Sequence, residues 1–591
     1  MISVLMLQGS PRKFQEADAP QPAVRFPQWR NLARVIILVC GFLQVWASRF
    51  YIEPDGVNYL EIARAYLRHD WAQAVSGFWS PLFSWVLAAV LWATRPGSYW
   101  EIPLIHLLNF MVFCITLWCF EFFLQALISK RRQTGNSENE ADDTADWIWW
   151  VLGYTLFTYA SLFLINVRFD TPDIFVNAFV FLASGLVLKF GAADSKWQTA
   201  ILLGIVLGFA YLAKTVMFPL GFVFLAAAYL SARGRKGALG MAVLAGAVFL
   251  AVSLPWIAVL TRAEHRLTFG DSGRIAYWMY SHDVPSTFHW HGEFPADGAP
   301  EHPIKKIFSQ PTVDSFTDPI GGSYPVLFNP SYWYEGAKPH FSMKGQLLIF
   351  GQTMPVYFLL LSAEKELLAG LLALIFFAGP LRKYAADLAK MASAWAPSLA
   401  AFVLYALVHV ESRFIGGFVA VFWCALFAAI HLRPDPVSRR VANSVILAVC
   451  VVLSIAIVRN CEDYLSDSFH PIPNTQWEVG MALNQMGLER GDLVAMIGSP
   501  SEANYWAHCA QVRIVADIQT RAVDEFWSAP PETKARVYAA IRGTAAKAIV
   551  TNTESKFGPP IGWKKIDATG YSVYFLDNPA ASDSDQPKSA P

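Results

Sequence analysis

Apolar stretches of roughly 20 residues recur along most of this 591-residue chain. A helix of that length spans the hydrocarbon core of a bilayer, and helices satisfy all of their backbone hydrogen bonds internally there. Hydrophobic residues make up 54% of the chain, and the mean hydropathy is +0.35. The sequence therefore predicts an all-α polytopic membrane bundle.

The apolar runs and the basic residues between them predict a topology. About 11 runs are long enough to span a bilayer, at residues 31–49, 101–127, 147–165, 174–191, 197–213, 215–232, 238–260, 364–381, 394–410, 414–431 and 441–458. Basic clusters such as Lys130–Arg132 and Arg233–Lys236 then share one side with the N-terminus, which the positive-inside rule makes the cytoplasm. Two shorter runs, 80–94 and 346–361, are therefore expected to form interfacial or re-entrant helices.

This topology divides the chain into four parts. They are a cytoplasmic tail (1–30), a transmembrane domain (31–459) with outer loops 50–100 and 262–345, a periplasmic domain (460–580) and a disordered tail (581–591). Helix and strand patterns alternate over the third part, which predicts a small α/β domain. Residues 57–68 show an amphipathic pattern and are expected to form a helix that lies flat on the membrane.

Composition excludes some classes of partner. Lys and Arg together number 46, as do Asp and Glu, so the chain has no basic field for nucleic acid. Seven cysteines occur without a CxxC pair, so neither a metal framework nor a disulfide framework is indicated. The string His289-Trp290-His291 is not interpreted as a metal site, because its remaining ligands are unspecified. We assign no cofactor; a divalent metal is compatible with the sequence but unsupported.

One carboxylate stands directly after the first predicted span. Asp55 lies in the segment Glu53-Pro54-Asp55-Gly56, at the predicted outer boundary of the membrane. It could cap the helix that follows. A partly desolvated carboxylate could also have a raised pKa and act as a general base. The two interpretations are compatible.

Further charged residues stand at the outer ends of later spans. These residues are Arg168, Asp170, Lys214, His409 and Arg413. Some of them have a purely structural alternative: Thr171-Pro172 predicts an N-cap and the start of the fourth span, Lys214 could be a snorkelling lysine, and Glu411 with Arg413 could only cap a turn.

Together with Asp55, however, these charged residues suit a reaction in which a lipid phosphate is the leaving group. The acid would activate a hydroxyl, and the cations would stabilise the departing phosphate.

Several of these features together resemble the GT-C membrane glycosyltransferases. They are the Asp after the first span, the helix containing Tyr59 and Ala63, the run Trp79-Ser80-Pro81-Leu82, the acid after the third span and the late Glu-Ser-Arg-Phe turn. The resemblance covers about residues 30–460 and is to the branch of protein mannosyltransferases, the aminoarabinose lipid A transferase and RgtA/B/C/D-like proteins. It implies a polyprenyl-phosphate sugar donor, an outer active site and inversion at the sugar carbon.

The resemblance also suggests roles for single residues. By position, Asp55 would be the base and Asp170 a second catalytic acid. Arg413 would match the late basic residue near the donor phosphate, and the charge pattern itself predicts that Arg168, Lys214 and His409 bind this phosphate as well. The aromatic residues Tyr59, Trp290 and Trp333 are predicted to contact acceptor or sugar, because aromatic faces suit sugar rings; for the loop that carries His289-Trp290-His291, a packed loop that covers the site is the alternative. Many relatives have Asp-Glu where this chain has Asp55-Gly56, so no metal is assigned there.

The sequence therefore predicts a glycosyltransferase of a bacterial inner membrane. It would move a sugar from a polyprenyl-phosphate donor to a hydroxyl of a glycan, lipid or protein acceptor on the outer face. A transporter or flippase of lipid-linked sugars is the alternative, and a non-catalytic assembly protein is a third. Transporters often show inverted repeats and mid-membrane charges. Here no repeat is visible and the charges stand at span ends, which favours transfer.

Overall fold

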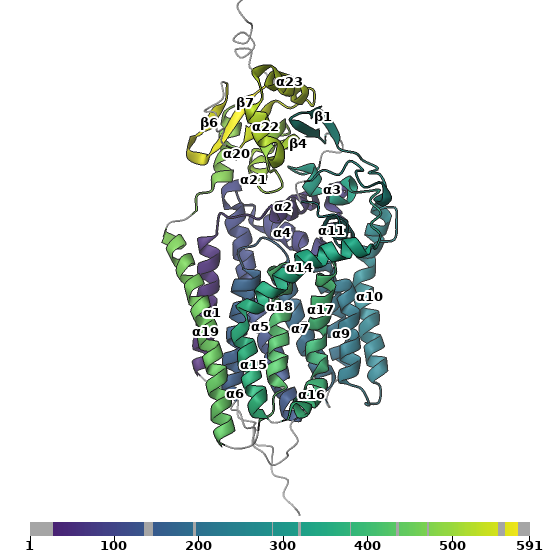
Figure 1. Ribbon diagram of the computed structural model, residues 1–591, viewed down its shortest axis with the longest axis vertical. Helices are drawn as coiled ribbons and strands as arrows, with labels where there is room; N and C mark the ends of the chain where they lie inside the picture. Colours follow the sequence, from purple (N-terminus) through teal and green to yellow (C-terminus); the bar gives the residue numbers. More distant parts are fainter. Residues whose placement is uncertain are drawn as a thin grey trace, which may run out of the picture.

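The structure, a computed structural model, describes residues 28–134, 146–192, 197–285, 288–316, 321–378, 380–432, 436–469, 472–553 and 562–576. Within this part of the chain, long helices form a bundle that carries an α/β domain at one end (Figure 1). The predicted tail 581–591 and nearly all of the tail 1–30 lie outside the described residues.

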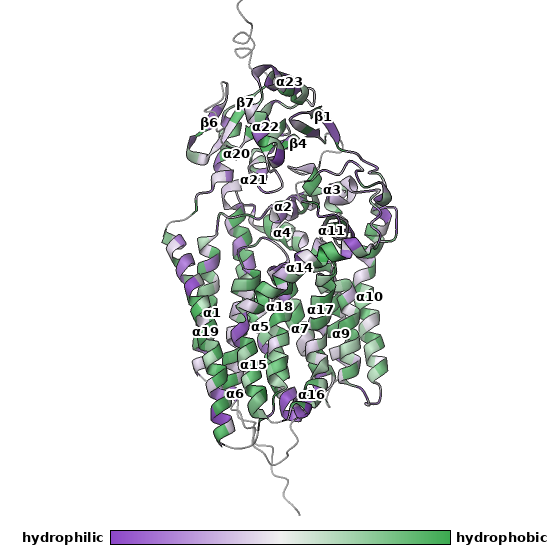
Figure 2. Cartoon of the chain, in the orientation of Figure 1, coloured by the Kyte–Doolittle hydropathy of each residue, from purple (hydrophilic) through white to green (hydrophobic). Residues whose placement is uncertain are grey.

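The bundle consists of apolar helices in the order that the hydropathy pattern predicts, and of one short helix rich in charged residues, α16. They are α1 (Gln28–Ala47), α5 (Glu101–Thr134), α6 (Asp146–Thr158) with a π-helical extension (Tyr159–Ile165), α7 (Asp173–Phe190), α8 (Trp197–Ala213), α9 (Met217–Ser231), α10 (Ala238–Ala263), α14 (Met343–Ala363), α15 (Lys365–Ala378), α16 (Leu381–Lys390), α17 (Ala392–Ala406), α18 (Ser412–Ala428) and α19 (Pro436–Phe469). Figure 2 shows that hydrophobic residues dominate these helices between the two ends of the bundle.

Among the described residues, seven helices are long and apolar enough to cross a membrane. The pair α15 and α16, bent by 114°, adds one further candidate, and α8, α9, α17 and α18 are shorter apolar helices. Helices that run in the same direction, separated in sequence by one reversed helix, also pack against each other, as α5 does with α7 and α8 with α10. The predicted class, a multi-pass helical membrane protein with a C-terminal α/β region, is confirmed.

The two runs predicted to be interfacial differ in length. The first forms α4 (Pro81–Thr94), which has 14 residues and is shorter than a typical span. The second belongs to α14, which has 21 residues and is long enough to cross. In Figure 1, α14 runs obliquely from the outer helix α11 (Ser272–Ser281) toward α15. The interfacial placement of both runs stays a prediction.

Short helices lie between the bundle and the α/β domain. They are α2 (Pro54–Leu67), α3 (Trp71–Ala74), α4, α11, α12 (Pro325–Phe328) and α13 (Pro330–Trp333). We expected residues 57–68 to form an amphipathic helix that lies flat on the membrane; α2 forms over this segment, and its flat placement stays a prediction. Asn58 and Glu61 on its polar side are buried, and Glu61 accepts hydrogen bonds from the backbone and hydroxyl of Ser323.

A seven-stranded sheet forms the centre of the α/β domain, in the order β1-β2-β4-β3-β5-β7-β6. Its strands are β1 (Lys305–Ser309), β2 (Thr312–Ser315), β3 (Leu493–Gly498), β4 (Arg513–Gln519), β5 (Ala548–Thr551), β6 (Lys564–Ile566) and β7 (Tyr571–Phe575). β3 is parallel to β4 and β5, and the other pairs are antiparallel. Because β1 and β2 come from the loop 262–345, the predicted boundary at residue 460 is corrected: residues 460–580 do not build this unit alone.

Hydrophobic clusters cover both faces of the sheet, and successive side chains of a strand point alternately into one cluster and the other. Val494 and Met496 of β3 face a cluster that includes α20 (Thr475–Gln485), α21 (Tyr505–Ala510) and aromatic residues of the outer loop. Ala495 and Ile497 face α22 (Thr520–Ser528) and α23 (Pro531–Arg542). The outer loop is thus part of the domain's hydrophobic core.

Candidate functional site

Asp55 stands in the first turn of α2, where it faces the end of a distant helix. Glu53 occupies the N-cap position and Pro54 the first helical position, so the interpretation of Asp55 as the capping residue is wrong. Its Oδ2 accepts a hydrogen bond of 3.0 Å from Arg413 Nη2, and the Asp55 side chain is 31% exposed. A negative charge at a helix N-terminus is favoured.

Arg413 lies at the centre of a cluster of charged residues. It is the second residue of α18 and its side chain is 11% exposed. Besides Asp55, its guanidinium contacts Glu411 (Nε to Oε2, 2.6 Å) and Asp173 (Nη1 to Oδ2, 3.8 Å). A planar guanidinium can hold several carboxylates at fixed angles, so Arg413 brings together residues from α2, α7 and the turn before α18.

Lys214 reaches the same cluster from the turn between α8 and α9. Its Nζ lies 2.5 Å from Asp173 Oδ1 and 3.5 Å from the ring centre of Phe414. Asp173, the first residue of α7, is buried and also accepts a hydrogen bond from Thr171 Oγ1. The predicted N-cap at Thr171 is corrected, because Pro172 holds that position. Asp173 was not selected from the sequence, although it follows Thr171-Pro172 directly.

His409 joins the cluster through Glu411. Its Nε2 lies 3.1 Å from Glu411 Oε1, and its ring stacks on Tyr280 of α11 with centroids 4.0 Å apart. His409 precedes α18, which begins at Ser412, so it does not share a helix with Arg413. Burial acts to raise the pKa of Glu411, but its bonds to His409 and Arg413 outweigh burial and lower this pKa to about 2. Glu411 is therefore an anion that holds both cations.

The surroundings of Asp55 suit a base. Burial raises the pKa of Asp55, and the positive charge of Arg413 opposes that rise. Burial also lowers the pKa of Lys214. Tyr59, about one turn beyond Asp55, is buried with its ring edge-on to Trp79 and Phe83. Burial thus increases the basicity of the Asp55 carboxylate, while Arg413 favours its charged form.

Asp170 occupies a second, fully enclosed place beside this cluster. Its carboxylate oxygens accept no hydrogen bond from the described residues, and His106 Nδ1 lies 3.7 Å from Oδ1. Burial raises the pKa of Asp170. A Cβ atom at Gly56 would lie 2.6 Å from Asp170 Cβ and 2.9 Å from its backbone oxygen. Glycine at position 56 therefore lets the start of α2 pack on the segment that carries Asp170.

Arg168 lies near the cluster without joining its ion pairs. Its guanidinium carbon is 4.8 Å from the ring centre of Tyr51 and 5.2 Å from that of Phe169. The guanidinium carbon of Arg413 lies 5.5 Å from the same Phe169 ring. Two cations therefore approach one aromatic ring, and cation–π attraction stabilises both.

Trp290 and Trp333 lie in the packed interior of the outer region. Trp290 contacts Trp278, with ring centroids 5.1 Å apart, and Trp333 donates its indole N–H to the Pro325 carbonyl at 3.0 Å. Both are buried in the core that includes α20 and α21. This burial corrects their predicted role as sugar contacts: they support the fold of the loop.

A cleft of about 460 Å³ lies at the other end of α2, against the C-terminal domain. Its lining includes Arg64, Arg68, Arg490, Arg513 and His508. His508 lies 3.2 Å from Glu61 and 3.3 Å from Glu101. Burial acts to lower the pKa of His508, but the two carboxylates outweigh burial and raise this pKa to about 9. No sequence pattern indicates this cleft, because α2 and the C-terminal domain contribute its cations from distant positions.

The chain matches no known family profile and no curated protein sequence. Among solved structures it is similar to ArnT from Cupriavidus metallidurans bound to undecaprenyl phosphate, with 13% identity, a TM-score of 0.38 and coverage of 93% of this chain and 98% of ArnT. It is also similar to the apo oligosaccharyltransferase of Archaeoglobus fulgidus, with 12% identity, a TM-score of 0.47 and coverage of 88% and 69%.

Proposed function

We propose that this protein is an integral membrane glycosyltransferase that uses a polyprenyl-phosphate sugar as donor at the outer face of a bacterial inner membrane. The observation that carries the proposal is the Asp55–Arg413 pair, at 3.0 Å, inside a cluster of two further carboxylates and Lys214. A carboxylate base held beside cations is the arrangement that transfer from a phosphate leaving group needs.

In the proposed reaction, Asp55 removes the proton from an acceptor hydroxyl. The hydroxyl oxygen then bonds to the anomeric carbon of the sugar, and the bond between that carbon and the phosphate oxygen breaks. The electron pair leaves with the polyprenyl phosphate, while the proton stays on Asp55. Attack from the face opposite to the phosphate inverts the anomeric centre.

The cations stabilise the charge that gathers on the departing phosphate. Arg413 and Lys214 are each held by Asp173, so they are positioned before the donor binds and need little reorganisation during the reaction. Arg168 shares the Phe169 ring with Arg413 and supplies a third positive charge nearby. His409 orients Glu411, which in turn holds Arg413.

The cleft suits an acceptor that carries negative charge. Four arginines, Arg68 and Arg490 among them, line it with His508, against the three carboxylates Glu61, Asp70 and Glu101, so cations outnumber anions in its lining. Arg64, also in the lining, lies nine positions after Asp55 on α2, about 14 Å along the helix axis at the usual helical rise. We therefore place the acceptor's anionic group in the cleft and its reacting hydroxyl at Asp55.

The direct test uses wild-type protein purified in detergent, a synthetic polyprenyl-phosphate sugar labelled in the sugar, and a panel of glycan and lipid acceptors with and without phosphate groups. We expect labelled acceptor to form and free polyprenyl phosphate to be released in equal amount. If no acceptor in the panel is labelled while the protein in liposomes moves the labelled lipid between leaflets, the transporter alternative is correct.

A further inference from the structure

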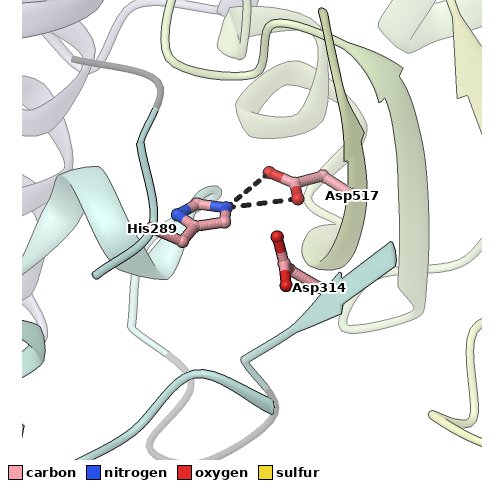
Figure 3. Close-up of side chains that lie close together, drawn as sticks. All are labelled: His289, Asp314 and Asp517. Carbon is pink, nitrogen blue, oxygen red and sulfur yellow. Dashed lines mark hydrogen bonds and ion pairs between the residues drawn. The ribbon is translucent and has the colours of Figure 1, made fainter. Parts of the chain in front are cut away.

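Three buried polar side chains meet where the outer loop joins the C-terminal sheet. Strand β2 pairs with β4 so that Asp314 stands directly opposite Asp517. His289 approaches from the loop, and Figure 3 shows its ring and both carboxylates facing one another. The side chains of Asp314 and Asp517 are at most 1% exposed and that of His289 is 2% exposed. None of these residues belongs to the Asp55 cluster.

The distances are those of a preformed ligand set. His289 Nε2 lies 3.0 and 3.2 Å from the two Asp517 oxygens. One ligand atom from each of the three residues lies within 4.8 Å of the others. In a tetrahedral zinc site with ligand bonds of about 2.0–2.2 Å, neighbouring ligand atoms are about 3.3 Å apart. Small side-chain movements would therefore close the three ligands around one ion.

The charges of the cluster favour a cation at its centre. Like charges opposite each other on neighbouring strands are destabilising, and buried charges need a partner or a metal. Asp314 Oδ1 forms no hydrogen bond with a described residue; its nearest basic neighbour is His291 Nε2, at 3.4 Å. A divalent ion would balance both carboxylates and leave His289 as a neutral ligand.

The neighbouring residues orient these ligands. Tyr324 donates its hydroxyl to Asp517 Oδ2 at 3.0 Å, as residues around metal ligands commonly do. Trp290 anchors the His289 backbone in the hydrophobic core, and the ring of Phe316 lies 5.7 Å from the His289 ring. These aromatic residues leave the ligands almost no exposed surface.

We propose that His289, Asp314 and Asp517 bind one structural Zn²⁺ ion, with His291 as the nearest candidate for a fourth ligand. A mixed nitrogen and oxygen ligand set suits zinc, and enclosed zinc sites stabilise folds. The ion would fasten the loop 262–345 to strand β4. Since α11 of this loop also carries Tyr280, which stacks on His409, the ion would hold one wall of the proposed catalytic cluster in place. The proposal does not depend on glycosyl transfer.

The test measures metal in the full-length protein, purified in detergent with a non-chelating affinity tag. Elemental analysis should find about one zinc per chain in the wild type and a large loss in Asp314→Asn and Asp517→Asn, because ligand loss weakens a zinc site strongly. Asp283→Asn, at an exposed position in the same loop, is the matched control and should keep its zinc.

A second measurement covers the case in which the variants misfold. Wild-type protein treated with a chelator should regain thermal stability when Zn²⁺ is added, and Co²⁺ should give visible absorption of a tetrahedral site. Neither metal should stabilise Asp314→Asn. The proposal is overturned if folded wild type holds no metal before or after incubation with Zn²⁺, or if Asp314→Asn keeps the wild-type zinc content. If wild type and Asp314→Asn are both metal-free, the cluster is only an ion pair between His289 and Asp517, and the proposal is overturned.

Discussion

Replacing Arg413 with glutamine should move the acid limb of the pH–activity profile to higher pH. Arg413 acts to lower the pKa of Asp55, against the effect of burial. Without this cation the pKa of Asp55 rises further, so more of the base is protonated at a given pH and activity is lost at higher pH than in the wild type. The direction of the shift distinguishes a base next to a cation from a structural ion pair.

The size of the shift follows from the geometry. Two unit charges about 4 Å apart near a protein surface interact by about 4 kcal/mol at an effective dielectric constant near 20. Asp55 is 31% exposed, so solvent screening should reduce this to about 1–2 kcal/mol. At 1.36 kcal/mol per pH unit, the acid limb should move by about one unit. Because Arg413 also meets the departing phosphate, the rate at the optimum should fall by about 10²–10³.

The assay is kcat/KM for transfer, measured from about pH 5 to about pH 9, because this parameter reports the pKa values of the free enzyme. Arg413→Lys should keep the acid limb near the wild-type position but lower the rate, since an ammonium group lacks the planar fork that holds three carboxylates. Arg382→Gln, at an exposed position in α16, is the control. An Arg413→Gln enzyme with an unshifted acid limb would refute the role given to Asp55.

Three further predictions concern the surroundings of the cluster. Gly56→Ala should lower stability by about 1–3 kcal/mol, because its methyl group would press on Asp170; thermal unfolding measures this. Arg68→Gln combined with Arg490→Gln should raise KM for an anionic acceptor several-fold and leave kcat nearly unchanged. This is expected when the lost interaction is equally strong in the bound substrate and in the transition state. The stabilising contribution of His508 should be complete below about pH 6.5 and lost as pH rises through about 9, because its pKa is raised in the folded state.

Each of these predictions has its own control. Gly351→Ala adds a methyl group where no atom lies within 4 Å, so it should leave stability unchanged; equal losses in both glycine variants would contradict the packing argument. An uncharged acceptor should be unaffected by the two arginine substitutions, and a loss of kcat for both acceptors would speak against a binding role. His508→Gln should abolish the loss of stability between about pH 6.5 and 9; if the loss persists, other groups cause it.

The hydropathy pattern was sufficient to predict the bundle, because each apolar run must be a helix to satisfy its backbone in lipid. Alternation along the C-terminal segment likewise predicted β3, β4, β5 and β7. It could not predict that β1 and β2 extend the same sheet. These strands lie far from β4 in sequence, and strand pairing over such a separation leaves no periodic signal in either segment.

The sequence predicted some residues of the site but not the residues that connect them, because those contacts form between segments far apart in the chain. Charged residues at span ends are unusual, so Asp55, Lys214, His409 and Arg413 were identified individually, and the structure brings all four together. The residues that connect them, Asp173 and Glu411, look like ordinary helix-end acids in sequence. Their role appears only when the ends of α7, α8 and α18 meet.

The central claim is that Asp55 is the base of a sugar transfer reaction, and Asp55→Asn tests it most directly. Asparagine has nearly the same shape, so the fold should be kept, as thermal unfolding can verify. The measurement is the initial rate of transfer from the labelled polyprenyl-phosphate sugar. Asp146→Asn is the control and should keep full activity, because Asp146 has an exposed side chain at the start of α6 and its ion-pair partner is Arg132. We predict a fall of about 10²–10⁴ for Asp55→Asn, the usual contribution of a positioned base. Transfer by Asp55→Asn at the wild-type rate would contradict the account.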